Sequence, residues 1–213
     1  GGNRFSLTAP RTFAFEPTLA SYLVRGTLPD ATAQQDILSL AMANPDVVGV
    51  FADPTIGSCI TCGRKAVGSD SDVAHLLDVG ALAKRGMNGS GVLLAIVDSG
   101  INIPHLVSKG RHPILDVAKS WKPSGVTTTP GQHPVEHGTM CAYDAGIAAP
   151  KATLLDYAVL LSHTPGANMM SGLLSDAVLA YSRLLTLLNS IPKTKRAMVV
   201  SNSWGMYDPS WDF

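Results

Sequence analysis

One aspartate and one histidine of this chain stand in local sequences that suit an acid–base pair. Asp98 directly follows an apolar run and precedes a Ser-Gly pair, whereas His137 is followed by Gly-Thr. A carboxylate can orient an imidazole and stabilise its protonated form while the imidazole takes a proton from a nucleophile. We therefore interpret Asp98 and His137 as catalytic residues, with His137 acting first as general base and then as general acid.

Two further stretches follow these residues, so that four motifs occur in a fixed order over about half of the chain. They are Val97-Asp98-Ser99-Gly100-Ile101, His137-Gly138-Thr139, residues 146–154 (GIAAPKATL) and residues 199–205 (VVSNSWG). In this order they resemble the motifs of the subtilisin-like serine proteases, the subtilases. The resemblance implies a serine endopeptidase that hydrolyses peptide bonds through an acyl-enzyme, with a triad in the order Asp, His, Ser.

The last motif contains the residues that the resemblance assigns to substrate binding. These are Ser203, Trp204 and Gly205, which would pair with a peptide as an added β-strand does. Trp204 would then lie near the wall of the pocket for the residue before the cleaved bond. Asn202 is not assigned to the oxyanion hole, because the family places that Asn on a later segment.

The third member of the triad has no counterpart in this sequence. None of the serines after His137 follows Gly-Thr, which is the context of the family's nucleophile. We expect the nucleophilic Ser to lie outside this chain, on a C-terminal half of the same protease that would be its partner, beside a peptide or protein substrate. A nicked protease and a truncated one both fit this expectation. The alternative is a noncatalytic peptide-binding or inhibitory module on a subtilase-derived fold.

A second pattern, H-x-x-E-H, overlaps the histidine motif and would suit an inverted zinc protease. It comprises His133, Glu136 and His137, but Pro134 fits poorly inside the helix that such a motif requires. Glu16 and Glu136 are the only glutamates, so the expected downstream Glu ligand is missing. We therefore expect no metal site and no cofactor, and we interpret His133 as a loop residue.

The three cysteines give no clear metal or nucleophile pattern. Cys59 and Cys62 form one C-x-x-C, and no second pair follows that would complete a zinc site. A local disulfide or two plain thiols are the simpler interpretations. Cys141 stands one helical turn after His137, where a small packing residue is expected, although a Cys-His enzyme stays open on the sequence alone.

Composition excludes several classes of protein. The formal net charge is zero, and 46% of the 213 residues are hydrophobic, with a mean hydropathy of +0.18. Neither a basic stripe nor an apolar run of membrane-spanning length occurs, so we expect neither a nucleic-acid partner nor a membrane. These values are typical of a globular protein with a substantial core.

The order of elements predicts an α/β fold with a mostly parallel sheet covered by helices, which the resemblance implies is subtilisin-like and incomplete. Residues 1–56 resemble a small α/β propeptide, residues 57–72 a linker, and residues 73–213 the first part of a catalytic domain. In the first segment, strands are expected within residues 5–15, 21–25 and 47–51, and a helix over residues 31–43. In the last, strands are expected at residues 92–97, 154–161 and 197–200, and helices at residues 73–85 and 173–188.

Overall fold

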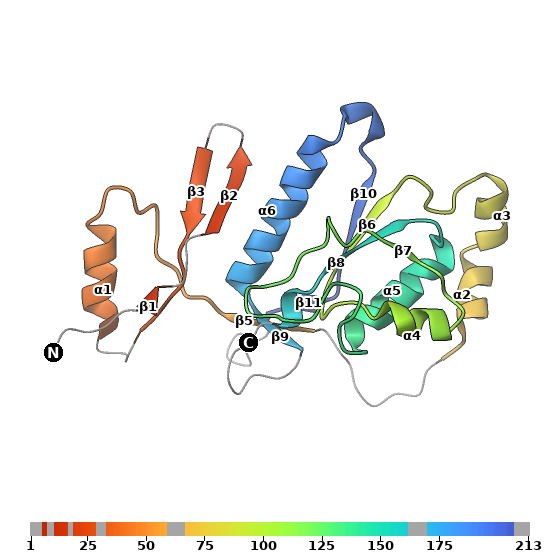
Figure 1. Cartoon of the computed structure of the whole chain (residues 1–213), viewed down its shortest axis with the longest axis horizontal. Helices are drawn as coiled ribbons and strands as arrows, with labels where there is room; N and C mark the ends of the chain where they lie inside the picture. Colours follow the sequence, from red (N-terminus) through yellow and green to blue (C-terminus); the bar gives the residue numbers. More distant parts are fainter. Residues whose placement is uncertain are drawn as a thin grey trace. The chain divides into compact units, whose positions relative to one another are not determined.

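The structure, a computed structural model, describes residues 6–7, 11–16, 19–28, 33–58, 67–161 and 170–206 (Figure 1). It divides into two compact units, Gly1–Pro54 and Thr55–Phe213, which are considered separately. No helix among the described residues is both long and apolar enough to cross a bilayer. Cys59 and Cys62 lie outside the described residues, as do residues 207–213.

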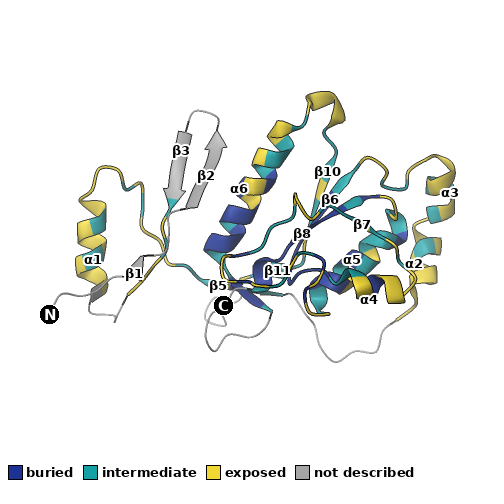
Figure 2. Cartoon of the chain, in the orientation of Figure 1, coloured by how far each residue is buried: buried dark blue, intermediate teal, exposed yellow. Residues whose placement is uncertain are grey.

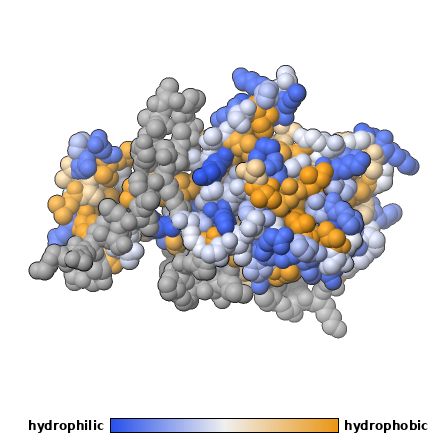
Figure 3. Space-filling view, in the orientation of Figure 1, coloured by the Kyte–Doolittle hydropathy of each residue, from blue (hydrophilic) through white to orange (hydrophobic). Residues whose placement is uncertain are grey.

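In the described part of the first unit, two antiparallel strand pairs and one helix are present. Strand β1 (Ser6–Leu7) pairs with β4 (Gly26–Thr27), and β2 (Arg11–Glu16) pairs with β3 (Leu19–Leu23). Helix α1 (Ala33–Met42) has several apolar residues on its surface, as Figure 3 shows. The strand predicted at residues 47–51 is wrong: these residues pair with no described strand, and Val48 and Phe51 are largely exposed. A β-branched run does not form a strand without a ladder partner.

The second unit is built on a four-stranded parallel sheet. Its order is β10 (Met198–Asn202), β6 (Leu93–Val97), β8 (Thr153–Tyr157) and β7 (Ile114–Leu115). Strands β6 and β8 are buried along most of their length (Figure 2), as their continuous apolar sequences predict. The expected mixed α/β fold with a parallel sheet is therefore confirmed.

Helices cover both faces of this sheet. Alternate residues of β6 point to opposite sides, so Ala95 and Val97 pack in one core cluster and Leu94 and Ile96 in the other. Helix α6 (Leu174–Ser190) contributes to the first cluster, and α4 (Ile103–Ser108) and α5 (His137–Ala148) contribute to the second. Strand β6 is thus held on both faces, which makes its carboxyl end a rigid place for a functional residue.

The helix expected at residues 73–85 is divided in two. Helix α2 (Asp70–Leu76) begins at a capping box formed by Ser69 and Asp72, and α3 (Val79–Lys84) follows. Between them Asp78 adopts a left-handed conformation with φ of 49° and caps α3 through its side chain. Periodicity alone did not reveal this break, because both helices share one apolar pattern.

A second, three-stranded antiparallel sheet lies in the same unit. Strand β5 (Thr55–Ser58) is its middle strand, with β9 (Ser171–Leu173) on one side and β11 (Trp204–Gly205) on the other. The linker expected from residue 57 therefore begins with part of a strand. The strand expected at residues 154–161 ends at Tyr157 and continues as a 3₁₀ helix, η1 (Val159–Leu161), beside β9.

Candidate active site

Asp98 lies at the carboxyl end of β6, as its position after the apolar run predicts. Its backbone N–H donates to the Tyr157 carbonyl at 3.0 Å, which continues the ladder between β6 and β8. Its carboxylate is 1% exposed and accepts a hydrogen bond of 2.6 Å from the Ser99 N–H. Gly100 then turns the chain with φ of +94°, a conformation that side-chain-bearing residues rarely adopt. The strand and the turn together fix the direction of the Asp98 carboxylate.

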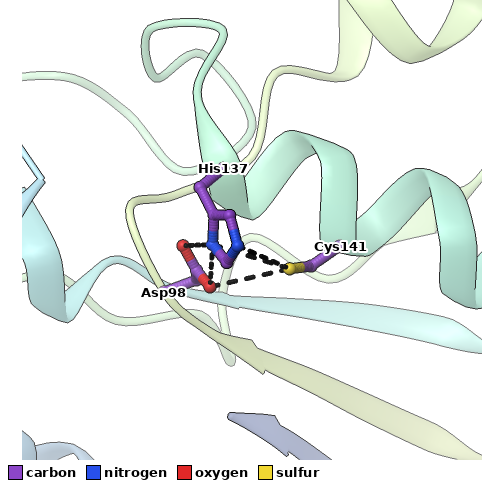
Figure 4. Close-up of side chains that lie close together, drawn as sticks. All are labelled: Asp98, His137 and Cys141. Atoms are coloured by element: carbon purple, nitrogen blue, oxygen red, sulfur yellow. Dashed lines mark hydrogen bonds and ion pairs between the residues drawn. The ribbon is translucent and has the colours of Figure 1, made fainter. Parts of the chain in front are cut away.

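His137 is the first residue of α5, and its imidazole points at Asp98 (Figure 4). The distances from His137 Nδ1 to the two carboxylate oxygens of Asp98 are 2.9 and 3.0 Å. Both side chains are almost fully buried, with 8% of His137 and 1% of Asp98 exposed. Two residues that are far apart in sequence and named independently by their motifs are therefore brought together.

The small residues of the two motifs explain how the backbones approach so closely. A Cβ atom on Gly138 would lie 2.6 Å from the Gly100 carbonyl oxygen, so only glycine fits there. The Gly138 N–H donates to Ser99 Oγ at 2.9 Å. Thr139 Oγ1 accepts from the Asn102 N–H at 3.0 Å. The Asp98 turn and the start of α5 thus interlock through the residues that follow the Asp and the His.

This arrangement assigns the protons of the imidazole. With its lone pairs facing Nδ1, the carboxylate of Asp98 favours the tautomer in which Nδ1 carries the hydrogen. His137 Nε2 then offers a lone pair on the opposite side of the ring. Within the described ranges, Nε2 forms no hydrogen bond with a hydroxyl group, and its one recorded neighbour is Cys141 Sγ at 4.0 Å. The pair can therefore act as a base toward a nucleophile placed at Nε2.

Cys141 is close to this pair but is poorly suited to be that nucleophile. Its Sγ lies 3.7 Å from both Asp98 Oδ2 and His137 Nδ1, and 3.6 Å from Ser203 Oγ. Burial raises the pKa of the thiol to about 11, and the Asp98 carboxylate also favours the neutral form. Since the thiolate is the reactive species, a thiol that stays mostly protonated at neutral pH is a weak nucleophile. The geometry favours the interpretation of Cys141 as a packing residue.

The same three side chains are the group of potential metal ligands found within the described part of the chain. One ligand atom from each of Asp98, His137 and Cys141 lies within 4.8 Å of the others. A cation there would need the Cys141 thiol to lose its proton and the Asp98–His137 hydrogen bond to break. The H-x-x-E-H alternative also fits poorly, because α5 begins at His137 and His133 precedes it.

The predicted substrate-binding residues lie where the chain passes from the parallel sheet to the second sheet. Ser203 joins β10 to β11, and the hydrogen-bond distance between Cys141 Sγ and Ser203 Oγ places it beside the acid–base pair. Trp204 and Gly205 form β11 and pair with Ser58 and Gly57 of β5. The segment that resembles the substrate strand of subtilases is therefore paired with an extended peptide, and that peptide belongs to the same chain.

Sequence reasoning did not predict β9, the strand that pairs with the other side of β5. Strand β9 pairs with β5 from the side opposite β11, in the register Thr55 with Leu173 and Ile56 with Gly172. The Ile56 side chain is fully buried. Gly172 lies so close to Val159 that a Cβ atom would be 2.1 Å from the Val159 carbonyl oxygen. A three-residue strand carries too little pattern to be recognised, so β9 could be found only from the structure.

A second buried acid–base pair lies next to the first. The sequence analysis named His133 only as a loop residue and did not predict its pairing with Asp156. His133 and Asp156 are both fully buried, with His133 Nε2 at 3.5 Å from Asp156 Oδ2. Burial raises the pKa of Asp156 to about 7 and lowers that of His133 to about 4. The signal that was available is Asp156 itself, a lone acid within the apolar strand β8.

No protein-family model and no curated protein matches this sequence. A function for the chain therefore rests on the residues and the geometry described above.

Proposed function

We propose that this chain is the N-terminal part of a subtilisin-like serine endopeptidase whose nucleophilic Ser lies outside these 213 residues. The observation that carries the proposal is the hydrogen bond of 2.9 Å between His137 Nδ1 and Asp98 Oδ2 beside a paired β-strand. The acid–base pair supplies proton transfer, and the strand supplies a place for an extended peptide. An endopeptidase needs both.

In the proposed reaction, His137 Nε2 takes the proton of the Ser hydroxyl as the Ser oxygen attacks the peptide carbonyl carbon. The imidazole becomes positively charged, and the Asp98 carboxylate stabilises that charge through Nδ1–H. His137 then gives the proton to the leaving amine, and the Ser is left as an acyl-enzyme. Water hydrolyses the acyl-enzyme with His137 again acting as general base.

Strand β5 supports a further part of the same proposal, an inhibitory propeptide. It lies between β9 and β11 and pairs with both, in the way that an extended peptide substrate would pair with strands beside an active site. Antiparallel pairing places Ser58, the last residue of β5, opposite Trp204, which directly follows Ser203. We expect maturation to cut the chain after β5, within the linker predicted at residues 57–72, and N-terminal sequencing of the processed protein measures this directly.

Substitution of His137 tests the catalytic assignment. In the protein completed by the Ser-bearing segment, His137→Ala should abolish peptide hydrolysis, whereas His75→Ala on the exposed surface of α2 should leave it unchanged. Intact-mass spectrometry under denaturing conditions identifies whether a second polypeptide with a Gly-Thr-Ser motif accompanies the chain. Unchanged hydrolysis by His137→Ala would remove the triad from consideration.

The second candidate is a noncatalytic peptide-binding or inhibitory module on the same fold. The central position of β5 between two strands favours this second candidate independently of His137. An extended segment is held there by strand pairing, which requires no catalytic residue. A completed protein that binds an extended peptide but hydrolyses none, with or without His137, would support this second candidate over the first.

A further inference from the structure

The buried pair formed by His133 and Asp156 has polar atoms that nothing else satisfies. Among the described residues, neither His133 Nε2 nor Asp156 Oδ1 has a hydrogen-bond partner. The distance of 3.5 Å between Nε2 and Asp156 Oδ2 brings the imidazole and the carboxyl group face to face. A buried polar atom without a partner is costly, so such atoms are retained where they serve a purpose.

Asp156 joins the Asp98 turn to the loop that precedes His137. Its Oδ2 accepts one hydrogen bond from the Ile101 N–H at 3.2 Å and another from the Gly131 N–H at 2.8 Å. Ile101 lies three residues after Asp98, and Gly131 lies six residues before His137. One carboxyl group on the central strand β8 therefore binds the backbones on both sides of the acid–base pair.

His133 makes the complementary contacts from the loop. Its backbone N–H donates to the Ile101 carbonyl at 3.1 Å, and its carbonyl accepts from Asn102 Nδ2 at 2.6 Å. Its ring packs directly on Gly100, where an added Cβ atom would lie 2.5 Å from His133 Cδ2. Thr128 Oγ1, at 2.6 Å from His133 Nδ1, holds the other edge of the ring.

These contacts add to those that α5 makes with the Asp98 turn. Gly138 and Thr139 of α5 hold Ser99 and Asn102, as described above, whereas His133 and Asp156 hold Gly100 and Ile101. The start of α5 thus contacts two residues of the turn, and the buried pair contacts two others. The positive charge of Lys122, whose Nζ donates to the Thr128 carbonyl at 2.7 Å, adds to burial in lowering the pKa of His133.

We propose that His133 and Asp156 are positioning residues, which hold the Asp98 turn and the start of α5 at the distance that the Asp98–His137 hydrogen bond requires. Neither residue touches the reacting atoms, and the catalytic consequence rests on the proposed protease function. The geometric consequence does not, because the bond between Asp98 and His137 exists in this chain without a nucleophile. The two can therefore be tested separately.

The geometric test is histidine NMR on the intact 213-residue chain with isotope-labelled histidine. An imidazole Nδ1–H bonded to a buried carboxylate gives a strongly deshielded proton signal, assigned to His137 by its loss in His137→Ala. Asp156→Asn should retain this signal, because the amide oxygen accepts from both N–H groups and the amide nitrogen can donate to His133 Nε2. Asp156→Leu should lose it, because both N–H groups lose their acceptor.

A matched control and a second variant keep this test decisive. Asp116→Leu removes a part-buried carboxylate that pairs with Lys119 and not with the Asp98 turn, and it should leave the signal unchanged. If Asp156→Leu fails to fold, His133→Phe replaces it in the test. This variant keeps a ring on Gly100 but removes both nitrogen atoms, so it should weaken the His137 signal. A folded Asp156→Leu or His133→Phe protein with the wild-type signal would overturn the proposal.

The catalytic test uses the completed protein and separates the two proposals. Asp156→Leu should lower kcat about 10²-fold with KM within about twofold, and Asp156→Asn should restore kcat to within about threefold of wild type, because small displacements of a catalytic group cost rate and not binding. If the wild type hydrolyses peptides and Asp156→Leu has an unchanged kcat, the positioning role is wrong. If the wild type hydrolyses nothing, the protease proposal fails while the NMR result still decides the positioning role.

Discussion

At the scale of single residues, the chemistry of the site depends on which side of the imidazole each neighbour occupies. Asp98 is at Nδ1, and Cys141 lies nearer to Nδ1 than to Nε2, at 3.7 and 4.0 Å. A nucleophile is activated when the lone pair of Nε2 accepts its proton. Cys141 Sγ is nearly equidistant from the two ring nitrogens and lies at the long limit of a sulfur hydrogen bond to Nε2, and its raised pKa disfavours it as the nucleophile.

Substitution of Cys141 provides the first prediction. Cys141→Ala should leave kcat of the completed protein within about threefold of wild type, because the thiol neither holds the imidazole nor carries the reacting proton. Steady-state hydrolysis of a chromogenic peptide measures this, with His137→Ala as the inactive reference. A loss as large as that of His137→Ala would revive the Cys-His enzyme that the sequence left open.

The buried pair makes a second prediction, on stability against pH. Folding lowers the pKa of His133 from 6.5 to about 4 and raises that of Asp156 from 3.8 to about 7, both through burial. Between pH 4 and 6.5 the unfolded pair holds one proton on His133, and the folded pair holds one on Asp156. Because the proton count is the same, the pair contributes little pH dependence to the free energy of unfolding in this window.

Each single variant should disturb this balance in an opposite direction. Asp156→Asn leaves only His133, which binds more protons when unfolded, so stability relative to wild type should rise with pH from 4 to 6.5. His133→Gln leaves only Asp156, which binds more protons when folded, so relative stability should fall. The slopes approach about 1.4 kcal/mol per pH unit. Urea denaturation followed by tryptophan fluorescence measures them, since all three tryptophans belong to the second unit. Parallel slopes for both variants would contradict the assignment.

At the scale of elements, the sequence predicted what local pattern encodes and missed what depends on distant partners. Strand β6 was predicted because its apolar run needs burial on both faces, and Asp98 came with it. Strand β9 was missed because three residues hold no period, and its place depends on β5, more than a hundred positions earlier. Asp156 was missed for the same reason, because its partners Ile101 and Gly131 come from another part of the chain.

Two glycines of α5 give a matched pair for the third prediction. Gly138→Ala should destabilise the second unit by about 1–3 kcal/mol and weaken hydrolysis, because its Cβ would lie 2.6 Å from the Gly100 oxygen. Gly146→Ala, in the same helix, has only Arg111 Cδ at 4.0 Å and should stabilise by up to about 1 kcal/mol. Chemical denaturation measures both, and equal effects would show that the close approach at Gly138 has no weight.

At the scale of the whole molecule, the division between the two units does not coincide with the division of roles. The units divide between Pro54 and Thr55, so β5 belongs to the second unit together with β9 and β11. The sequence assigned residues 1–56 to the propeptide-like segment because the linker after them is rich in Gly and Ser. Local composition does not show that Thr55–Ser58 would find its partners in the second unit.

The burial of Ile56 supplies the fourth prediction. Ile56→Asp should displace β5 from its place between β9 and β11, because a carboxylate there would be buried without a partner. In the completed protein, hydrolysis should then begin without the lag that removal of β5 imposes on the wild type. Thr55→Asp, at the exposed neighbouring position, is the control and should keep the lag. An unchanged lag in Ile56→Asp would show that β5 does not block the binding of the peptide substrate.

Because β5 is covalently continuous with the unit in which it lies, its pairing with β9 and β11 does not depend on protein concentration. A tethered segment is present at an effective concentration in the millimolar range, whatever the dilution of the protein. A cut after β5 in the linker would turn the same strand into part of a separate molecule that competes at its bulk concentration. Latency before the cut would then be independent of dilution, whereas latency after the cut would disappear on dilution alone.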